Sequence, residues 1–376
     1  MISPKLFYTC LQNVGIDFYA GVPDSLLKNL CAYITDNAPR TNNIIAANEG
    51  GAMGLAAGHY LATGKTPVVY MQNSGIGNAV NPLMSLTDKD VYNIPVLLVI
   101  GWRGEPGVHD EPQHVKQGKA TLPLLEAMGI KYEILTGDEA ELEAQIKRAA
   151  EYMSATKEAF ALVVKKGTFA DYKLQTDRKS SCTMEREDAI KLVAASLGEK
   201  DVVVSTTGKI SRELFEYRAD NNQGHAQDFL TVGSMGHASQ IALGIALSKP
   251  NRNVYCFDGD GATIMHMGSL GIVGEMMPKN YYHVVFNNGA HDSVGGQPTI
   301  GFDIDIPEIA ASCGYKTVVS VDNEEDLKQT LASLTDNEAP LLLEVKVKKG
   351  ARENLGRPTT TPIQNKEALM EFLNND

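Results

Sequence analysis

The amino-acid sequence predicts an α/β protein with two doubly wound parallel sheets and no third domain between them. Apolar runs rich in β-branched residues recur along the chain and are continuous rather than alternating, as in strands that are covered on both faces. Segments of helical pattern separate these runs, which is typical of parallel sheets. With 376 residues the chain is long enough to build two hydrophobic cores.

The predicted strands and helices fill both halves of the chain. Strands are predicted at residues 44–47, 67–71, 94–100, 160–164, 201–205, 253–257, 282–287 and 340–347. Helices are predicted at residues 50–64, 138–153, 187–198 and 323–334, the last one capped by Asp322. The polar stretch 167–183 predicts a linker between one domain at 1–166 and another at 184–376, in which 350–362 is a loop or wrapped tail.

Composition and charge exclude several classes of partner. The net charge of −12 disfavours a nucleic acid or an anionic membrane, but a small anionic ligand can still bind to local basic residues. The five cysteines are odd in number, scattered and without metal-ligand spacing, which favours a reducing, cytoplasmic location. No apolar run approaches the roughly 18 residues that a membrane span needs, and the first residues, MISPKLFYTCL, contain no apolar signal core.

Acidic and amide side chains follow two consecutive predicted strands of the second half. Asp258-Gly259-Asp260-Gly261 ends the run at 253–257, and Asn287-Asn288-Gly289 ends the run at 282–287. Ligands of doubly wound sheets bind beyond the carboxyl ends of the strands, and carboxylate and amide oxygens suit Mg²⁺. Either motif alone could be an ordinary turn, because Asp, Asn and Gly are the usual turn residues. Their occurrence after two strands favours a metal site.

The two motifs together resemble the signature of the thiamine-diphosphate enzymes, in which Gly-Asp-Gly precedes Asn-Asn. The resemblance implies the two-domain thiamine-diphosphate-binding fold, with thiamine diphosphate and Mg²⁺ as cofactors. It implies that Asp260, Asn288 and the carbonyl of Ala290 hold the metal. It implies that Ala262, after Gly259 and Gly261, lies at the coenzyme's diphosphate, and Thr206 and Thr207 are further candidates for contact with that diphosphate.

Two further segments match the same family and carry its catalytic groups. IIAANEGGAMG resembles the segment whose glutamate, here Glu49, touches the aminopyrimidine ring, and burial there would raise its pKa. The alternative is a glutamate that only favours a helix N-terminus. TVGSMGHASQ resembles the segment that bends the coenzyme, with Met235 as the wedge and the Gly233 carbonyl as an acceptor. The alternative for Met235 is core filling.

The missing third domain restricts the predicted reaction. Most decarboxylases of this family carry a middle domain, and the short form is typical of members that act on 2-oxo acids with a distal phosphonate or sulfonate. Segments 21–27, 110–118 and 287–299 resemble the members that act on phosphonates. This implies a carboxy-lyase of phosphonate biosynthesis that converts 3-phosphonopyruvate into phosphonoacetaldehyde and CO₂. Sulfopyruvate or another 2-oxo acid is the alternative substrate.

Substrate and proton-transfer residues are predicted in loops next to these motifs. The candidates for contact with the small anionic 2-oxo acid are Asp24, Ser25, Lys209, Arg212, Arg352 and Arg357. Each cation could equally be a solvated surface charge. His114 and His291 are candidates for proton transfer, although a lone histidine is often only a packed residue. The resemblance also implies a homodimer or larger homo-oligomer with sites between subunits.

Two functions of other classes compete with the decarboxylase. A catalytically inactive homologue would bind the coenzyme only for assembly or regulation, but Glu49, Asp260 and Asn288 are all present. A nicotinamide-dependent dehydrogenase would need Gly-x-Gly-x-x-Gly after the first strand, and the sequence lacks it there.

Overall fold

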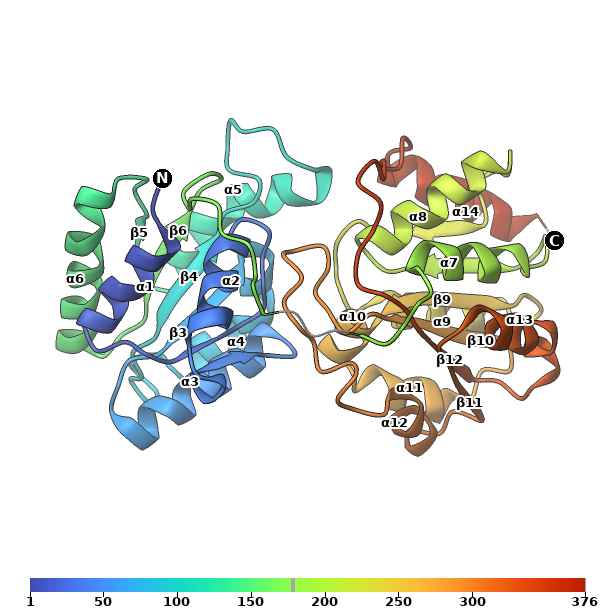
Figure 1. Cartoon of the computed structure of the whole chain (residues 1–376), viewed down its shortest axis with the longest axis horizontal. Helices are drawn as coiled ribbons and strands as arrows, with labels where there is room; N and C mark the ends of the chain where they lie inside the picture. Colours follow the sequence, from blue (N-terminus) through green and yellow to red (C-terminus); the bar gives the residue numbers. More distant parts are fainter. Residues whose placement is uncertain (177–179, 376) are drawn as a thin grey trace. The chain divides into compact units, whose positions relative to one another are not determined.

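The computed structural model describes residues 1–176 and 180–375 and consists of two compact units. Unit 1 comprises Met1–Arg178 and Ser293–Gln297, and unit 2 comprises Lys179–Asp292 and Pro298–Asp376. Each unit has a six-stranded parallel sheet with helices on both faces (Figure 1). The prediction of an α/β protein with two doubly wound sheets is confirmed.

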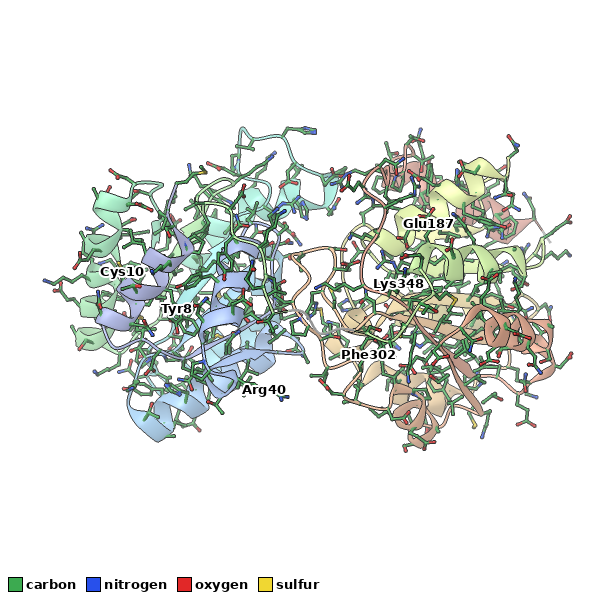
Figure 2. The ribbon with its side chains drawn as sticks, viewed as in Figure 1. Tyr8, Cys10, Arg40, Glu187, Phe302 and Lys348 are labelled. Carbon is green, nitrogen blue, oxygen red and sulfur yellow. The ribbon has the colours of Figure 1, made fainter. Side chains whose placement is uncertain are left out.

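The sheet of unit 1 has the strand order β2-β1-β3-β4-β6-β5. Its strands are β1 (Tyr19–Gly21), β2 (Asn43–Ile45), β3 (Val68–Gln72), β4 (Leu97–Gly101), β5 (Lys131–Ile134) and β6 (Phe160–Val164). One face packs against α1 (Pro4–Asn13), α2 (Lys28–Asn37) and α6 (Glu139–Thr156). The core on this face includes Tyr8 and Cys10 of α1, which Figure 2 labels. The other face packs against α3 (Glu49–Thr63), α4 (Ile76–Ser85) and α5 (Pro112–Ala127).

The sheet of unit 2 repeats this topology, with the order β11-β12-β10-β9-β7-β8. Its strands are β7 (Val202–Ser205), β8 (Asp228–Leu230), β9 (Val254–Gly259), β10 (Tyr281–Asn287), β11 (Thr317–Val321) and β12 (Leu341–Lys346). One face packs against α7 (Arg186–Ala195), α8 (Lys209–Asp220) and α13 (Glu324–Ala332). The other packs against α9 (Ala238–Ser248), α11 (Ser269–Met276), α12 (Ile306–Ser312) and α14 (Pro362–Asn374). The short helix α10 (Asp260–Met265) follows β9 directly.

Sequence patterns missed four strands, β1, β5, β8 and β11. Of these, β5, β8 and β11 lie at sheet edges, and β1 and β8 have only three residues each, so none produces a long apolar run. The predicted cap of α13 was wrong by one residue. Asn323, not Asp322, accepts the backbone N–H of Asp326 at 2.9 Å.

The predicted linker and tail both have ordered contacts within a unit. In the linker, the hydroxyl of Tyr172 donates to Asp36 at 3.0 Å, and Phe169 forms a bridge with Ile2, while residues 177–179 lie outside the described residues. The tail 350–362 is a loop that leads into α14, where Thr361 and Gln364 form a capping box.

No helix among the described residues combines the length and the apolar character that crossing a membrane would require.

Candidate active site

The carboxyl end of β9 places Asp260 at the start of α10 in unit 2. The side chain is buried, accepts a hydrogen bond from the Thr299 hydroxyl, and lies 3.4 Å from the backbone nitrogen of Asn288. Burial raises the pKa of Asp260 to about 6, although these hydrogen bonds oppose the shift. A bound cation would favour the ionised carboxylate, which is what a metal ligand has to be.

The neighbouring strand β10 brings Asn288 and Ala290 to the same place. The side-chain oxygen of Asn288 accepts the Ala290 N–H at 3.0 Å, and this hydrogen bond stabilises the turn that follows β10. Gly301 packs against these groups. A Cβ atom there would lie 2.6 Å from Oδ2 of Asp260 and 2.7 Å from Oδ1 of Asn287. Only glycine leaves room for the carboxylate in this position.

The side chains around Asp260 fit a magnesium diphosphate. A carboxylate, an amide oxygen and a backbone carbonyl form the hard-oxygen set that Mg²⁺ prefers. The hydroxyl of Thr263 is buried and has no hydrogen-bond partner among the described residues, so a donor is left for a ligand oxygen. Thr206 follows β7, and its N–H donates to the carbonyl of Phe257 on β9 at 2.7 Å. Thr206 and Thr207 therefore lie beside this strand end.

The loop between β8 and α9 packs against the Gly259–Ala262 turn. A Cβ atom on Gly236 would lie 3.1 Å from the Ala262 carbonyl oxygen and 2.6 Å from the His266 ring. The Met235 methyl group lies 3.5 Å from where a Cβ atom of Gly261 would be. Met235 belongs to none of the hydrophobic clusters formed by the described residues, which argues against core filling. Gly233 lies in the same loop, two residues earlier.

His291 borders the same turn. Its Cε1 atom would lie 3.2 Å from a Cβ atom on Gly261. Burial lowers the pKa of His291 to about 4, so the imidazole is neutral at neutral pH. Unit 2 therefore gathers Asp260, Asn288, Met235 and His291 around one glycine-rich turn.

In unit 1, Glu49 is the first residue of α3 and is buried. Its Oε2 atom accepts a hydrogen bond from the side-chain amide of Asn78 at 2.7 Å. A Cβ atom on Gly75, in the turn after β3, would lie 2.2 Å from Oε1 of Glu49. The turn can therefore close onto the carboxyl group only because residue 75 is glycine.

A second polar cluster of unit 1 contains three predicted residues and two that the sequence analysis left without a role. Arg103, which follows β4, donates to Asp110 and, at 2.8 Å, to the hydroxyl of Ser25. His114 Nδ1 lies 2.9 Å from Asp110. Asp24 is fully buried and accepts the N–H groups of Leu26 and Leu27 at 2.9 and 3.2 Å.

Charge and burial set the protonation of this cluster. The hydrogen bond from Arg103 holds the pKa of Asp110 well below its usual range. Burial lowers the pKa of His114 although Asp110 opposes the shift, and burial raises the pKa of Asp24 to about 6. His114 lies in the first turn of α5, but Asp110 precedes the helix, so helical spacing gives no signal of this pair.

The Arg103 cluster and Glu49 are connected through Asn73. The Asn73 side chain donates to the Arg103 carbonyl at 2.8 Å and accepts the Arg103 N–H at 3.2 Å. Asn73 is also the first residue of the turn that contains Gly75. The predicted residues of unit 1 thus lie along the carboxyl ends of β1–β4.

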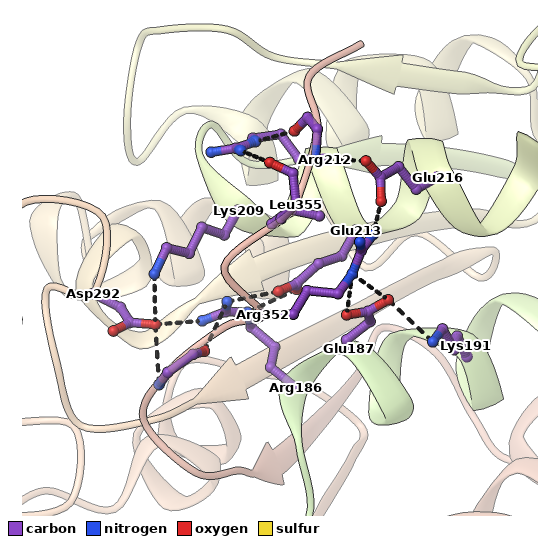
Figure 3. A network of polar contacts seen from close by, with 12 residues as sticks. Arg186, Glu187, Lys191, Lys209, Arg212, Glu213, Glu216, Asp292, Arg352 and Leu355 are labelled. Atoms are coloured by element: carbon purple, nitrogen blue, oxygen red, sulfur yellow. Dashed lines mark hydrogen bonds and ion pairs between the residues drawn. The ribbon is translucent and has the colours of Figure 1, made fainter.

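The predicted substrate-binding cations of unit 2 have different surroundings (Figure 3). Arg212 donates to the carbonyls of Leu355 and Gly356, and Arg352 pairs with Glu187 and Glu216, so both fasten the tail to α7 and α8. Lys209 lies 3.3 Å from Asp292. Arg357 is exposed in the same tail.

A buried polar chain that the sequence analysis missed lies behind the Gly259–Ala262 turn. Asp258 accepts the Gly259 N–H at 3.0 Å, and its other oxygen lies 3.4 Å from Nε2 of His283. Nδ1 of His283 is 3.2 Å from the Tyr315 hydroxyl. Burying these groups is costly unless they pair, so we interpret the chain as a brace for the turn.

Comparison with known proteins identifies the family. The N-terminal thiamine pyrophosphate-binding domain of thiamine pyrophosphate enzymes matches residues 4–122, and their C-terminal binding domain matches residues 206–345. The chain is 35% identical to a phosphonopyruvate decarboxylase of Streptomyces viridochromogenes, over 97% of this chain and 93% of the relative. The chain belongs to the thiamine pyrophosphate enzymes.

Two further relatives cover nearly all of the chain. A phosphonopyruvate decarboxylase of Streptomyces hygroscopicus is 34% identical, over 99% of this chain and 94% of the relative. A sulfopyruvate decarboxylase of Methanosarcina acetivorans is 29% identical, over 96% of this chain and 94% of the relative. The first matched domain falls in unit 1, and the second falls in unit 2 except for Ser293–Gln297.

Proposed function

We propose that the protein decarboxylates 3-phosphonopyruvate to phosphonoacetaldehyde and CO₂, in the biosynthesis of phosphonates, with thiamine diphosphate and Mg²⁺. The observation that carries this proposal is the similarity to two phosphonopyruvate decarboxylases over almost the full chain, at 35% and 34% identity. The sulfopyruvate decarboxylase is more distant at 29%, so sulfopyruvate is the second candidate substrate.

The residues of unit 2 are proposed to hold the coenzyme's charged end. Asp260, the side-chain oxygen of Asn288 and the Ala290 carbonyl would bind Mg²⁺, and the unpartnered Thr263 hydroxyl would face the diphosphate. Thr206, Thr207 and the backbone of 259–262 would complete the diphosphate site, with Met235 and the Gly233 carbonyl against the middle of the coenzyme. When bound, the coenzyme would accept the electron pair that remains when the substrate loses CO₂.

The residues of unit 1 are proposed to handle protons at the other end. Glu49 would share a proton with the aminopyrimidine ring, and its contacts with Asn78 and Gly75 fix the carboxyl group for that task. One proton enters the product for each CO₂ released. His114, oriented by Asp110, and His291 are the candidates to relay this proton from solvent. Asp24, Ser25 and Lys209 would contact the anionic substrate, because Arg212 and Arg352 are already engaged in fastening the tail.

We further propose a homo-oligomer, at least a dimer, in which unit 1 of one copy and unit 2 of another share a site. The family resemblance supports this arrangement, and so do exposed apolar side chains, such as Leu61 on α3 at 73% exposure and Ile272 on α11 at 54%. The cysteines are all free, which supports a reducing, cytoplasmic location.

The test is CO₂ release from 3-phosphonopyruvate and from sulfopyruvate, each with and without thiamine diphosphate and Mg²⁺. We expect faster release from 3-phosphonopyruvate, dependence on both cofactors, and phosphonoacetaldehyde as the product seen by NMR. Equal or faster turnover of sulfopyruvate would overturn the substrate. Absence of cofactor-dependent release from either acid would favour an inactive homologue.

A further inference from the structure

The basic residues at the edge of the unit 2 site differ in how firmly they are held (Figure 3). Arg186 is 4% exposed and makes a bidentate pair with Glu213, with distances of 2.8 and 2.7 Å. Arg212 of α8 holds the tail, and Arg352 of the tail pairs with Glu187 of α7. Lys209 is 24% exposed, and within residues 1–176 and 180–375 its ion-pair partner is Asp292 alone, at 3.3 Å.

Asp292 does not depend on Lys209 to remain in place. Its Oδ2 atom also lies 3.2 Å from Nη1 of Arg186 and accepts the Gly350 N–H at 3.2 Å. If Lys209 moved away, two donors would still satisfy the carboxylate. Loss of the Lys209 contact therefore leaves no buried acceptor unpaired, and an anionic ligand can take the place of Asp292 beside the ammonium group. The ammonium group can therefore exchange partners, whereas the guanidinium groups cannot do so without releasing the tail or α7.

The position of Lys209 suits an anionic group of a small substrate. It is the first residue of the 12-residue helix α8, directly after Thr206-Thr207-Gly208, and helix N-termini favour anions. Its partner Asp292 follows His291, whose ring borders Gly261. In 3-phosphonopyruvate a single carbon separates the phosphonate from the 2-oxo group. Its anchor must therefore lie close to the residues that hold the coenzyme.

We infer that Lys209 is the anchor for the substrate's distal anion, and that it leaves Asp292 to bind the phosphonate. Asp292 keeps the ammonium group in position until the substrate arrives. This inference rests on the proposed function and deepens it. When Lys209 exchanges Asp292 for the substrate, it favours substrates whose distal group carries more negative charge. A dianionic phosphonate attracts the ammonium more strongly than a sulfonate monoanion does, and pyruvate has no distal anion to compete with Asp292.

The first test uses the holoenzyme of three variants. In Lys209→Met we expect kcat/KM for 3-phosphonopyruvate to fall about 100-fold, the size of one charge-assisted hydrogen bond, mainly through KM. The fall should be smaller for sulfopyruvate and smallest for pyruvate. Lys209→Arg should recover part of the loss. Lys191→Met, which removes a lysine that pairs with Glu187 on α7, is the matched control and should behave like the wild type.

The second test measures binding without turnover. Calorimetry would titrate the holoenzyme with 3-phosphonopropionate, which carries the same distal anion but lacks the 2-oxo group. Lys209→Met should weaken binding about 100-fold. Asp292→Asn, which keeps an oxygen for Arg186 and Gly350 but removes the competing charge, should strengthen it several-fold.

The outcomes separate this inference from the proposed function. Unchanged binding in Lys209→Met, or an equal loss of kcat/KM for all three acids, would overturn the role of Lys209. If Asp292→Asn binds 3-phosphonopropionate no more tightly than the wild type does, the proposal that Lys209 leaves Asp292 for the phosphonate is overturned. If the wild-type holoenzyme binds 3-phosphonopropionate through Lys209 but does not decarboxylate 3-phosphonopyruvate, the proposed function fails and the anion anchor stands. If it binds no phosphonate, the anchor fails whatever the turnover.

Discussion

The two units have the same strand order but present different groups at equivalent strand ends. After the second strand, unit 1 places Glu49 at the start of α3, whereas unit 2 places Met235 in the loop before α9. After the third, unit 1 has the Gly75 turn and unit 2 has Asp260. Topology determines the edge at which a site forms, and the side chains at that edge determine what it binds.

The two key carboxyl groups are also held in different ways. Glu49 is held by a side-chain amide and by the close turn at Gly75. Asp260 is held by a hydroxyl group and lies next to a backbone N–H, and its surroundings include backbone and amide oxygens that can share a cation. The first arrangement suits proton exchange with a neutral ring, and the second suits a metal ion. Variants of each unit can therefore separate the two roles.

The largest effect is expected for Glu49→Gln in unit 1. The amide keeps the size of the side chain but cannot exchange the proton, so turnover should fall at least about 1,000-fold. Steady-state CO₂ release measures this loss. Calorimetry with thiamine diphosphate and Mg²⁺ should show that the coenzyme still binds. Undiminished turnover would refute the proton role of Glu49.

A smaller loss is expected for Gly75→Ala, which places a Cβ atom 2.2 Å from Oε1 of Glu49. The carboxyl group must shift, and a misplacement of this kind typically costs about 100-fold in rate. Gly77→Ala is the matched control, because a Cβ atom there meets nothing within 4 Å. If both alanine variants have the same turnover, the turn does not position Glu49.

In unit 2 the corresponding change is Gly301→Ala, whose Cβ atom would lie 2.6 Å from Oδ2 of Asp260. We expect the affinity for Mg²⁺ in the presence of thiamine diphosphate to fall by about 30-fold, the range seen when groups behind a metal ligand are disturbed. Gly271→Ala on α11 has open space around it and serves as the control. Equal Mg²⁺ affinity in both variants would contradict the metal role of this edge.

The last expected effect concerns the stability of unit 1 as a function of pH and not its activity. Burial raises the pKa of Asp24 to about 6 in the folded protein, so the ionised group destabilises the fold above that pH, and the cost disappears as the pH falls toward 4. Asp24→Asn should therefore be more stable than the wild type at pH 7, by up to about 3 kcal/mol. The difference should shrink by about 1.4 kcal/mol per pH unit below 6 in denaturant unfolding. If the stability difference between Asp24→Asn and the wild type does not change with pH, Asp24 does not have a raised pKa in the folded protein.

Sequence patterns predict the buried strands and the motifs at their ends but not the contacts between side chains. Asp260, Asn288 and Glu49 could be found because each follows a long apolar run or belongs to a family motif. Arg103 and Asp110 could not be assigned, because their pairing depends on a loop that brings residues from two elements together. The His283 brace was missed because a lone histidine inside an apolar run gives no signal of its partner on the neighbouring strand.

Edge strands were missed for a related physical reason. Parts of β5 and β11 face solvent, so polar residues interrupt their apolar pattern.

The sequence also could not show that the four predicted cations have different partners. Arg212 binds the tail, Arg352 of the tail pairs with Glu216 of α8, and Lys209 faces Asp292, and no local pattern encodes these contacts between distant segments.

The central claim is that Glu49 of one copy and Asp260 of another serve the same coenzyme. Mixed assemblies that contain one Glu49→Gln chain and one Asp260→Asn chain test it most directly, with CO₂ release from 3-phosphonopyruvate as the measurement. Each homomeric variant should be nearly inactive, but a mixed dimer should keep one intact site and about half of the wild-type activity. A mixed dimer as inactive as its parents would contradict the claim.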